Sequence, residues 1–203
     1  MKTLLIIALS LTTTFAFAAG KAKTAPKAGL DVVKVPAVGE VQWTGYGVGK
    51  SHTGSLNISS GAVQMKGDTF VGGEFTIDMA SLKTGDSPRL EGHLKSADFF
   101  DVEKNKEATF KITSVEAIKD AKAGEPTHKI VGDLTIKGKT LPQTFMAVVA
   151  KEGKGFKATA KTQIADRTKY DIVYNSAQFK TASALGDKLI EDKIDVVLDI
   201  RTK

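Results

Sequence analysis

The chain has 203 residues, no cysteine and a formal net charge of +6. This length is enough for one domain with its own hydrophobic core, and the lack of cysteine excludes disulfides and an acylated N-terminal cysteine. Lysines and arginines are scattered among aspartates and glutamates, whereas a nucleic-acid-binding surface needs a dense basic stripe with aromatic residues. We therefore expect a single domain without a nucleic-acid partner.

The first 18 residues have the layout of a signal peptide. Lys2 precedes an uncharged run rich in Leu and Ile over residues 3–17, and the small residues Ala16 and Ala18 lie just before the expected cleavage site. The apolar run is too short, and too interrupted by threonines, to anchor the chain in a membrane. We expect export to the periplasm, no transmembrane segment after cleavage, and a flexible basic segment over residues 19–40.

From Val41 onward, apolar and polar residues alternate, which is the period that turns successive side chains of a β-strand to opposite faces. The clearest alternating runs are 75–79, 110–112, 134–136, 156–164 and 194–200. Turn sequences separate them: SSG at 59–61, KGD at 66–68, KGK at 137–139 and EGKG at 152–155. Because such short connections join antiparallel neighbours, we predict an all-β domain over residues 41–203 with about eight antiparallel strands, enough to close a barrel.

Three segments depart from this alternation. FMAVVA at 145–150 is apolar on both faces, which predicts that a loop or helix covers its outer face. Residues 87–100 have Leu90 and Leu94 four positions apart, which favours a short amphipathic helix across the sheet. Residues 181–193 predict one or two helical turns before the last strand.

Local motifs for catalysis or metal binding are lacking in the sequence. The three histidines, His52, His93 and His128, share no metal-ligand spacing, and no glycine-flanked serine elbow occurs. The glycine-rich stretch 45–54 lacks the lysine-serine ending and the following helix of a phosphate loop, so its glycines fit a bent or bulged strand better. We predict no catalytic residue, no metal and no cofactor.

Several stretches of the chain carry a resemblance to a known family: GGEFTIDMASLKTG, GHLKSADFFDVEKNKEATFKI, KIVGDLTIKGKTLPQTF and DRTKYDIVYNS. They resemble the YceI family of exported bacterial proteins that bind lipids or polyisoprenoids in a lipocalin-like barrel. The similarity extends from about Val41 to Ile200. The resemblance implies an eight-stranded antiparallel lipocalin-like barrel with one or two short helices, and non-enzymatic binding of a long apolar or amphiphilic ligand such as a polyisoprenoid or another lipid.

In such a barrel, one parity of each strand faces the lumen. Phe99 and Phe100 follow the predicted helix, and we expect them to form an apolar lid over one mouth, with Asp98, Asp101 and Glu103 facing water. The predicted lumen and mouth residues are Trp43, Phe75, Ile77, Leu94, Phe99, Phe100, Phe110, Ile112, Leu134, Ile136, Phe145 and Phe156. The predicted contacts to a polar head group are His52, His93 and Arg167.

The composition is also compatible with a filled barrel and with other functions. Phenylalanines can fill the inside of a small barrel as well as line an open lumen. The alternative functions are therefore a lipid-modifying enzyme that uses the same lumen and an envelope stress or structural protein with a filled core. The sequence also leaves open whether the chain forms a homodimer.

The signal-peptide layout gives a first testable prediction. Cleavage after Ala18 yields a mature chain that begins at Ala19. N-terminal sequencing of protein recovered from the periplasmic fraction of expressing cells should read Ala-Gly-Lys-Ala. Protein that begins at Met1 and stays in the cytoplasmic fraction would contradict export.

Overall fold

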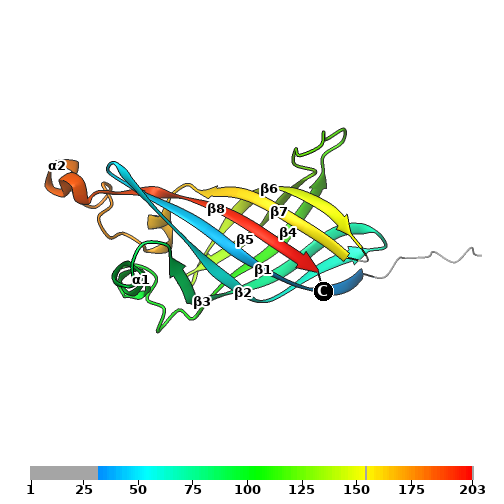
Figure 1. Cartoon of the computed structure of the whole chain (residues 1–203), viewed down its shortest axis with the longest axis horizontal. Helices are drawn as coiled ribbons and strands as arrows, with labels where there is room; N and C mark the ends of the chain where they lie inside the picture. Colours follow the sequence, from blue (N-terminus) through cyan, green and yellow to red (C-terminus); the bar gives the residue numbers. More distant parts are fainter. Residues whose placement is uncertain (1–31, 154, 203) are drawn as a thin grey trace, which may run out of the picture.

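The computed structural model describes residues 32–153 and 155–202, so the predicted signal peptide and most of the segment 19–40 lie outside the described residues. Eight antiparallel strands form one closed barrel in chain order, because β8 pairs back onto β1 (Figure 1). The strands are β1 (Val32–Gly47), β2 (Lys50–Lys66), β3 (Thr69–Thr84), β4 (Glu107–Ala117), β5 (His128–Ile136), β6 (Lys139–Glu152), β7 (Gly155–Ile164) and β8 (Ile190–Thr202). The all-β prediction and the eight-stranded antiparallel barrel are confirmed.

The first strand begins at Val32, so the predicted domain start at Val41 is wrong. The pairing of β1 with β2 shifts register between Pro36 and Gly39, and this irregularity interrupts the apolar alternation that would have marked the strand. Gly39 is required at this point, because a Cβ there would collide with the carbonyl oxygen of Asp199 on β8. The N-terminal part of β1 therefore belongs to the barrel wall.

Three of the four predicted turns are confirmed, and they join β2 to β3, β5 to β6 and β6 to β7. Lys137 and Gly138 form a two-residue hairpin loop in which both residues have positive φ, at 49° and 71°. That pair of angles is typical of the hairpin turn whose twist matches the flanking strands. SSG at 59–61 is not a turn: it lies inside β2, where the register with β3 shifts between Ile58 and Ser60.

Glycines on neighbouring strands make room for three inward-facing aromatic rings. Trp43 lies opposite Gly54, and Phe75 lies opposite Gly61. Phe110 lies over Gly132, where an added Cβ would be 2.5 Å from the ring and 2.5 Å from the carbonyl oxygen of Lys111. Glycine is therefore needed where a large ring must lie flat against the neighbouring strand.

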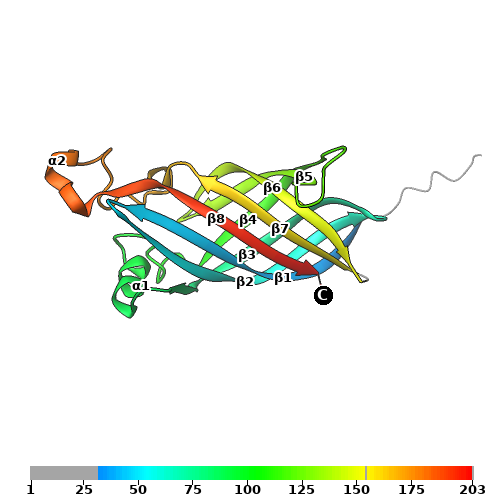
Figure 2. The same ribbon diagram turned by 45° about the horizontal axis from the view of Figure 1, so that its top comes forward.

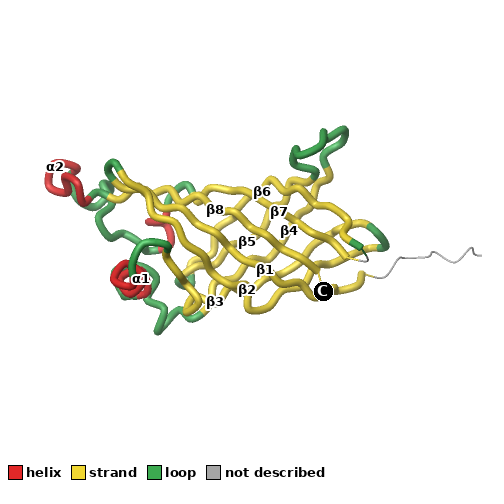
Figure 3. The backbone as a smooth tube through the Cα atoms, viewed as in Figure 1, coloured by secondary structure: helices red, strands yellow, loops and turns green. Residues whose placement is uncertain are grey.

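Helical segments gather at one end of the barrel (Figure 3). They are α1 (Pro88–Lys95), η1 (Arg167–Tyr170), α2 (Ala182–Leu185) and η2 (Gly186–Lys188). The Ser87 hydroxyl caps α1 by accepting a hydrogen bond from the Leu90 amide, and a proline follows in the first turn. Both predicted helical regions are confirmed, and we call the connections 85–106 and 165–189 the cap, and this end the cap end. None of the helices in the described part of the chain is long and apolar enough to cross a membrane.

The outer face of β6 is not covered, contrary to the prediction from FMAVVA. Phe145 and Ala147 point inward and are buried, whereas Met146 is 41% exposed on the outer face. Isolated exposed apolar side chains are common on protein surfaces, so this strand needs no cover.

The surroundings of Gly132 and Gly92 predict opposite effects of the two Gly→Ala substitutions on stability. G132A should destabilise the protein by about 1 to 3 kcal/mol, because the new methyl group overpacks the Phe110 ring and a main-chain carbonyl. G92A, in the exposed middle of α1 where nothing lies within 4 Å, should stabilise it by about 0.5 to 1 kcal/mol. Urea denaturation midpoints of the two variants would test this, and equal midpoints would contradict it.

Candidate functional site

The inside of the barrel is hollow. It holds a cavity of about 460 Å³ that is lined by residues of all eight strands. This volume lies within the range of small-molecule sites, roughly 300 to 1,000 Å³. The barrel is elongated, and its strands are tilted relative to its long axis (Figure 2). The structure therefore favours the open lumen among the two readings that composition left undecided.

All the side chains predicted for the lumen and mouth line this cavity: Trp43, Phe75, Ile77, Leu94, Phe99, Phe100, Phe110, Ile112, Leu134, Ile136, Phe145 and Phe156. Sequence reasoning missed Tyr170, Ile172 and Tyr174, which line it from the cap. These three residues alternate at a spacing of two, and that alternation was the signal that could have identified them. The alternation does not mark a strand here, because Arg167–Tyr170 form a 3-10 helix and turns follow it.

Alanines on the inner face of two adjacent strands help to leave this space. Ala147 on β6 is paired with Ala160 on the adjacent strand β7, and Ala158 of β7 lies on the same inner face. A methyl side chain reaches only a short way into the barrel, so these three positions leave space that a larger side chain would fill. The same two strands also carry Phe145 and Phe156, so the cavity lies where small side chains stand next to large ones on its wall.

Phe99 and Phe100 form part of the cap, as expected for a lid. Phe99 is only 6% exposed, and its ring centroid lies 5.0 Å from that of His93 and 5.3 Å from that of Tyr174. The loop is held by its main chain, since Lys137 Nζ donates to the Phe99 carbonyl at 2.7 Å. Asp98 and Glu103 are exposed and Asp101 is half-buried. Phe99 is therefore a packed part of the barrel core as well as a cavity wall.

The two predicted head-group histidines lie at the cap end and both line the cavity. His93 Nε2 is 2.9 Å from Asp98 Oδ2, and His52 Nδ1 is 3.0 Å from Asp86 Oδ2. The His52 nitrogen is not aligned for a hydrogen bond with that carboxylate and has no other partner among the described residues. Each imidazole is thus placed between an apolar cavity and an aspartate at its rim.

Arg167 has a role in holding the fold that the sequence did not predict. It is 2% exposed, and its guanidinium donates four hydrogen bonds to main-chain carbonyl oxygens. Burial lowers the pKa of this group, and the nearby carboxylate of Asp192, 3.3 Å away, opposes that shift. Because most of its donors are used within the cap and by the start of β8, Arg167 ties the cap to the barrel and has little capacity left for a ligand head group.

Two side chains of the lumen wall carry polar groups that the sequence analysis did not predict as polar contacts. Trp43 Nε1 is a buried donor with no hydrogen-bond partner in the described part of the chain. Tyr170 is 1% exposed, and burial raises the pKa of its hydroxyl, which therefore stays protonated. An unpaired buried donor is costly, so Trp43 Nε1 is suited to an acceptor atom that enters the cavity.

Charged residues that line the cavity lie at its cap end. They are Lys50, Arg167, Asp187, Lys188, Glu191 and Lys193. The opposite end is lined by Met65, Phe70 and Phe156, with Thr202 as a polar neighbour. Within the described residues, no three His, Asp or Glu side chains are grouped so that they could hold a metal ion. The site is an apolar tunnel with one polar rim.

Curated relatives match about half of the chain. A UPF0312 protein of Ectopseudomonas mendocina is 37% identical over 99 residues, which is 45% of this chain and 49% of the relative. A UPF0312 protein of Pseudomonas putida strain W619 is 40% identical over 103 residues, or 46% of this chain and 50% of the relative. The chain thus spans about half the length of the curated relatives that it matches.

Two solved structures share the fold. BcnA of Burkholderia cenocepacia superposes with a TM-score of 0.64 at 22% identity, covering 81% of this chain and 96% of that one. A polyisoprenoid binding domain from Saccharophagus degradans gives a TM-score of 0.55 at 11% identity, covering 85% and 99%. At these identities the likeness concerns the fold alone.

The profile of the YceI-like domain matches residues 32–202, the same span that the closed barrel occupies. Because this match covers all the described residues, and these form a closed barrel with a hollow apolar interior, the chain belongs to the YceI-like domain family.

Proposed function

We propose that this protein is an exported, non-enzymatic carrier that holds a long apolar or amphiphilic ligand, such as a polyisoprenoid or another lipid, in the barrel lumen. The observation that carries the proposal is the apolar tunnel of about 460 Å³. The polyisoprenoid binding domain from Saccharophagus degradans, which shares the fold, supports the same ligand class.

The lumen suits a chain better than a compact molecule. Its walls are elongated and apolar, so each buried methylene of a ligand gains about 0.8 kcal/mol. A wall that is mostly apolar recognises length and bulk but discriminates only weakly between chains that differ by one methylene. We therefore expect affinity to rise with chain length until the tunnel is full.

In this proposal the polar part of the ligand lies at the cap end. Trp43 Nε1 offers an unused donor from the wall, and His52 and His93 offer imidazoles at the rim. Arg167 is not part of this proposal, because its guanidinium is committed to main-chain carbonyls. An oxygen-bearing head group held between the wall and the rim satisfies Trp43 without removing a charge from water.

Ligand binding can be followed through Trp43, which is the only tryptophan in the chain and lines the cavity. Titration with polyprenols of increasing length should change its emission and raise the thermal midpoint, because a ligand at a hundred times its Kd adds about 2.7 kcal/mol to the stability of the folded state. Polyprenols that leave both signals unchanged would contradict the proposal.

A blocked lumen provides the control for this titration. Gly45 lines the cavity, and the nearest atom to an added Cβ is a Trp43 ring carbon at 3.9 Å, so a larger side chain has room to enter the tunnel. G45F should fold and bind polyprenol at least tenfold more weakly, whereas G45A should bind as the unmodified protein does. A G45F variant that binds with unchanged affinity would show that the ligand lies elsewhere.

The lid gives a separate prediction. Phe99 is buried against His93 and Tyr174, so F99A should cost about 3 to 5 kcal/mol of stability as well as affinity. Phe100 is half-buried, so F100A should lower polyprenol affinity with a smaller loss of stability. Urea midpoints and dissociation constants of both variants would test the difference. An F100A variant that loses stability but keeps its affinity would contradict a role for Phe100 at the ligand.

A further inference from the structure

Two segments project at the cap end, and the one that contains α2 reaches furthest from the barrel (Figures 1 and 2). One is the β1–β2 turn at residues 47–50, and the other is the segment 173–188, which contains α2. They are neighbours, because Gly47 pairs with Ile190 and the Ile190 amide donates to the Asn175 carbonyl at 3.0 Å. We call residues 47–50 and 173–188 together the tip.

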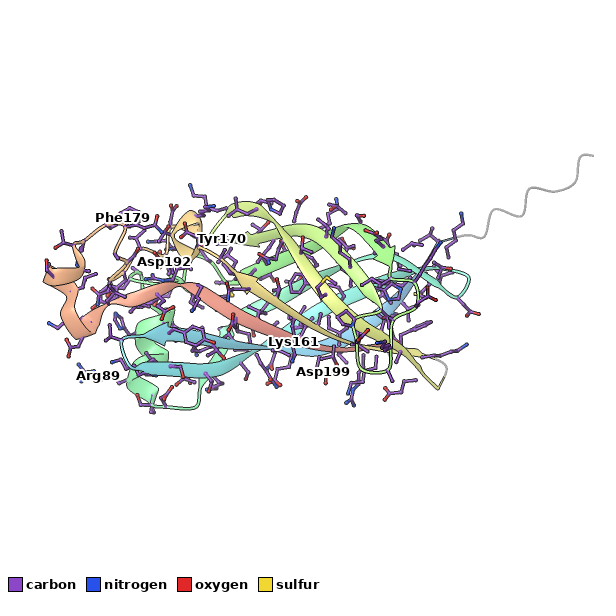
Figure 4. All side chains as sticks on the ribbon, turned by 90° about the horizontal axis from the view of Figure 1, so that it is seen from above. Arg89, Lys161, Tyr170, Phe179, Asp192 and Asp199 are labelled. Atoms are coloured by element: carbon purple, nitrogen blue, oxygen red, sulfur yellow. The ribbon has the colours of Figure 1, made fainter. Side chains whose placement is uncertain are left out.

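The tip carries exposed apolar side chains. Phe179 is 60% exposed, Val48 is 53% exposed and Val173 is 38% exposed. Phe179 is the most exposed large apolar side chain in the described part of the chain, and it points away from the barrel on the outside of the cap end (Figure 4). It does not line the cavity, so ligand binding in the lumen does not explain it.

The charge of the tip is predominantly positive. Lys50, Lys180 and Lys188 are exposed, and none of them forms an ion pair with a described residue. Asp187 is the single acidic residue within the tip ranges. On the barrel wall some lysines are paired with acids, as Lys157 is with Asp199 at 3.4 Å, and others, such as Lys111 and Lys161, form no ion pair with a described residue.

The lumen reaches this surface. Lys50, Asp187 and Lys188 belong to the tip and also line the cavity. The exposed apolar side chains and the unpaired lysines therefore belong to the same surface on which the polar end of the tunnel lies.

We propose that the tip docks on a membrane surface that contains anionic phospholipids. Phe179 and Val48 enter the headgroup region, and the three lysines lie at the level of the lipid phosphates. A few apolar side chains or a few lysines alone bind a bilayer weakly, but the two contributions add. Docking of the tip is an interaction separate from ligand binding in the lumen. It rests on the proposed function in one respect: it places the polar end of the tunnel against the bilayer from which a lipid enters.

A protein partner fits this surface less well. A stable protein interface buries about 1,200 to 2,000 Å² and has a packed apolar centre, whereas the tip offers three separated apolar side chains beside flexible lysines. A lipid headgroup layer needs no shape complementarity, so scattered apolar residues and unpaired positive charge are sufficient for it.

Vesicle cosedimentation of the purified, ligand-free protein tests the proposal. The protein should sediment with vesicles that contain phosphatidylglycerol and phosphatidylcholine, and not with vesicles of phosphatidylcholine alone. Because screening shortens the range of the lysine charges, about 0.5 M NaCl should release it. Absence of binding to the anionic vesicles would overturn the proposal.

Substitutions in the tip test whether this surface is the one that contacts the membrane. K50Q/K180Q/K188Q should weaken vesicle partitioning on the order of a hundredfold, at about fivefold for each lysine, and V48S/F179S should weaken it at least tenfold. The matched control is V71S/M146S, which removes two exposed apolar side chains from the barrel wall and should partition as the unmodified protein does. Equal partitioning of all variants would assign any binding to other lysines and overturn the role of the tip.

Two further measurements separate the possible failures. F179S should keep its polyprenol affinity in the Trp43 titration, so loss of vesicle binding in this variant is not loss of the ligand site. Sedimentation equilibrium gives the oligomeric state. A protein that forms dimers which F179S dissociates, and that does not bind anionic vesicles, would show that a second copy of the chain covers the tip and would overturn the proposal.

Discussion

The hydrogen-bonded closure of β8 onto β1 is the constraint on which the rest of the structure depends. A sheet with two free edges would expose unpaired main-chain groups and would need a packed core to hold its shape. Here β1 pairs with β8, with Trp43 opposite Val196, so every strand has a paired neighbour on both sides. The wall is therefore held largely by its own main-chain ladder, and its interior need not be completely filled.

The size of the side chains then decides where the interior is empty. Aromatic rings of β1, β3 and β4 lie against glycines and fill one part of the barrel, while β6 and β7 present Ala147, Ala158 and Ala160 to the inside. A void among apolar side chains sacrifices dispersion contacts and so lowers stability. A chain that keeps such a void across all eight strands is better explained by a ligand that occupies it than by a core that failed to pack.

The cap makes the two ends of this tunnel unequal. Arg167 donates to carbonyl groups of Ile172, Tyr174, Ile190 and Glu191, and so holds the cap segment against the start of β8. Lys137 joins the β5–β6 turn to both cap connections, because its ammonium donates to the Phe99 and Asp171 carbonyls. With the cap held in this way, the imidazoles and charged side chains gather at one end, and an amphiphile has one orientation in which its polar part meets polar groups.

What the sequence alone determined is the parity of the strands: a period of two assigns each side chain to one face, and the strand residues predicted for the lumen, from Trp43 to Phe156, all line the cavity. Alternation fails where register shifts, so the start of β1 at Val32 and the irregular pairing of β2 between Ile58 and Ser60 were not predictable from it. Only the tertiary structure decided that Arg167 serves main-chain carbonyls, that Met146 lies uncovered, and that the lumen is open. These outcomes depend on contacts between residues far apart in the chain, and no local pattern encodes how much space remains when eight strands close around it.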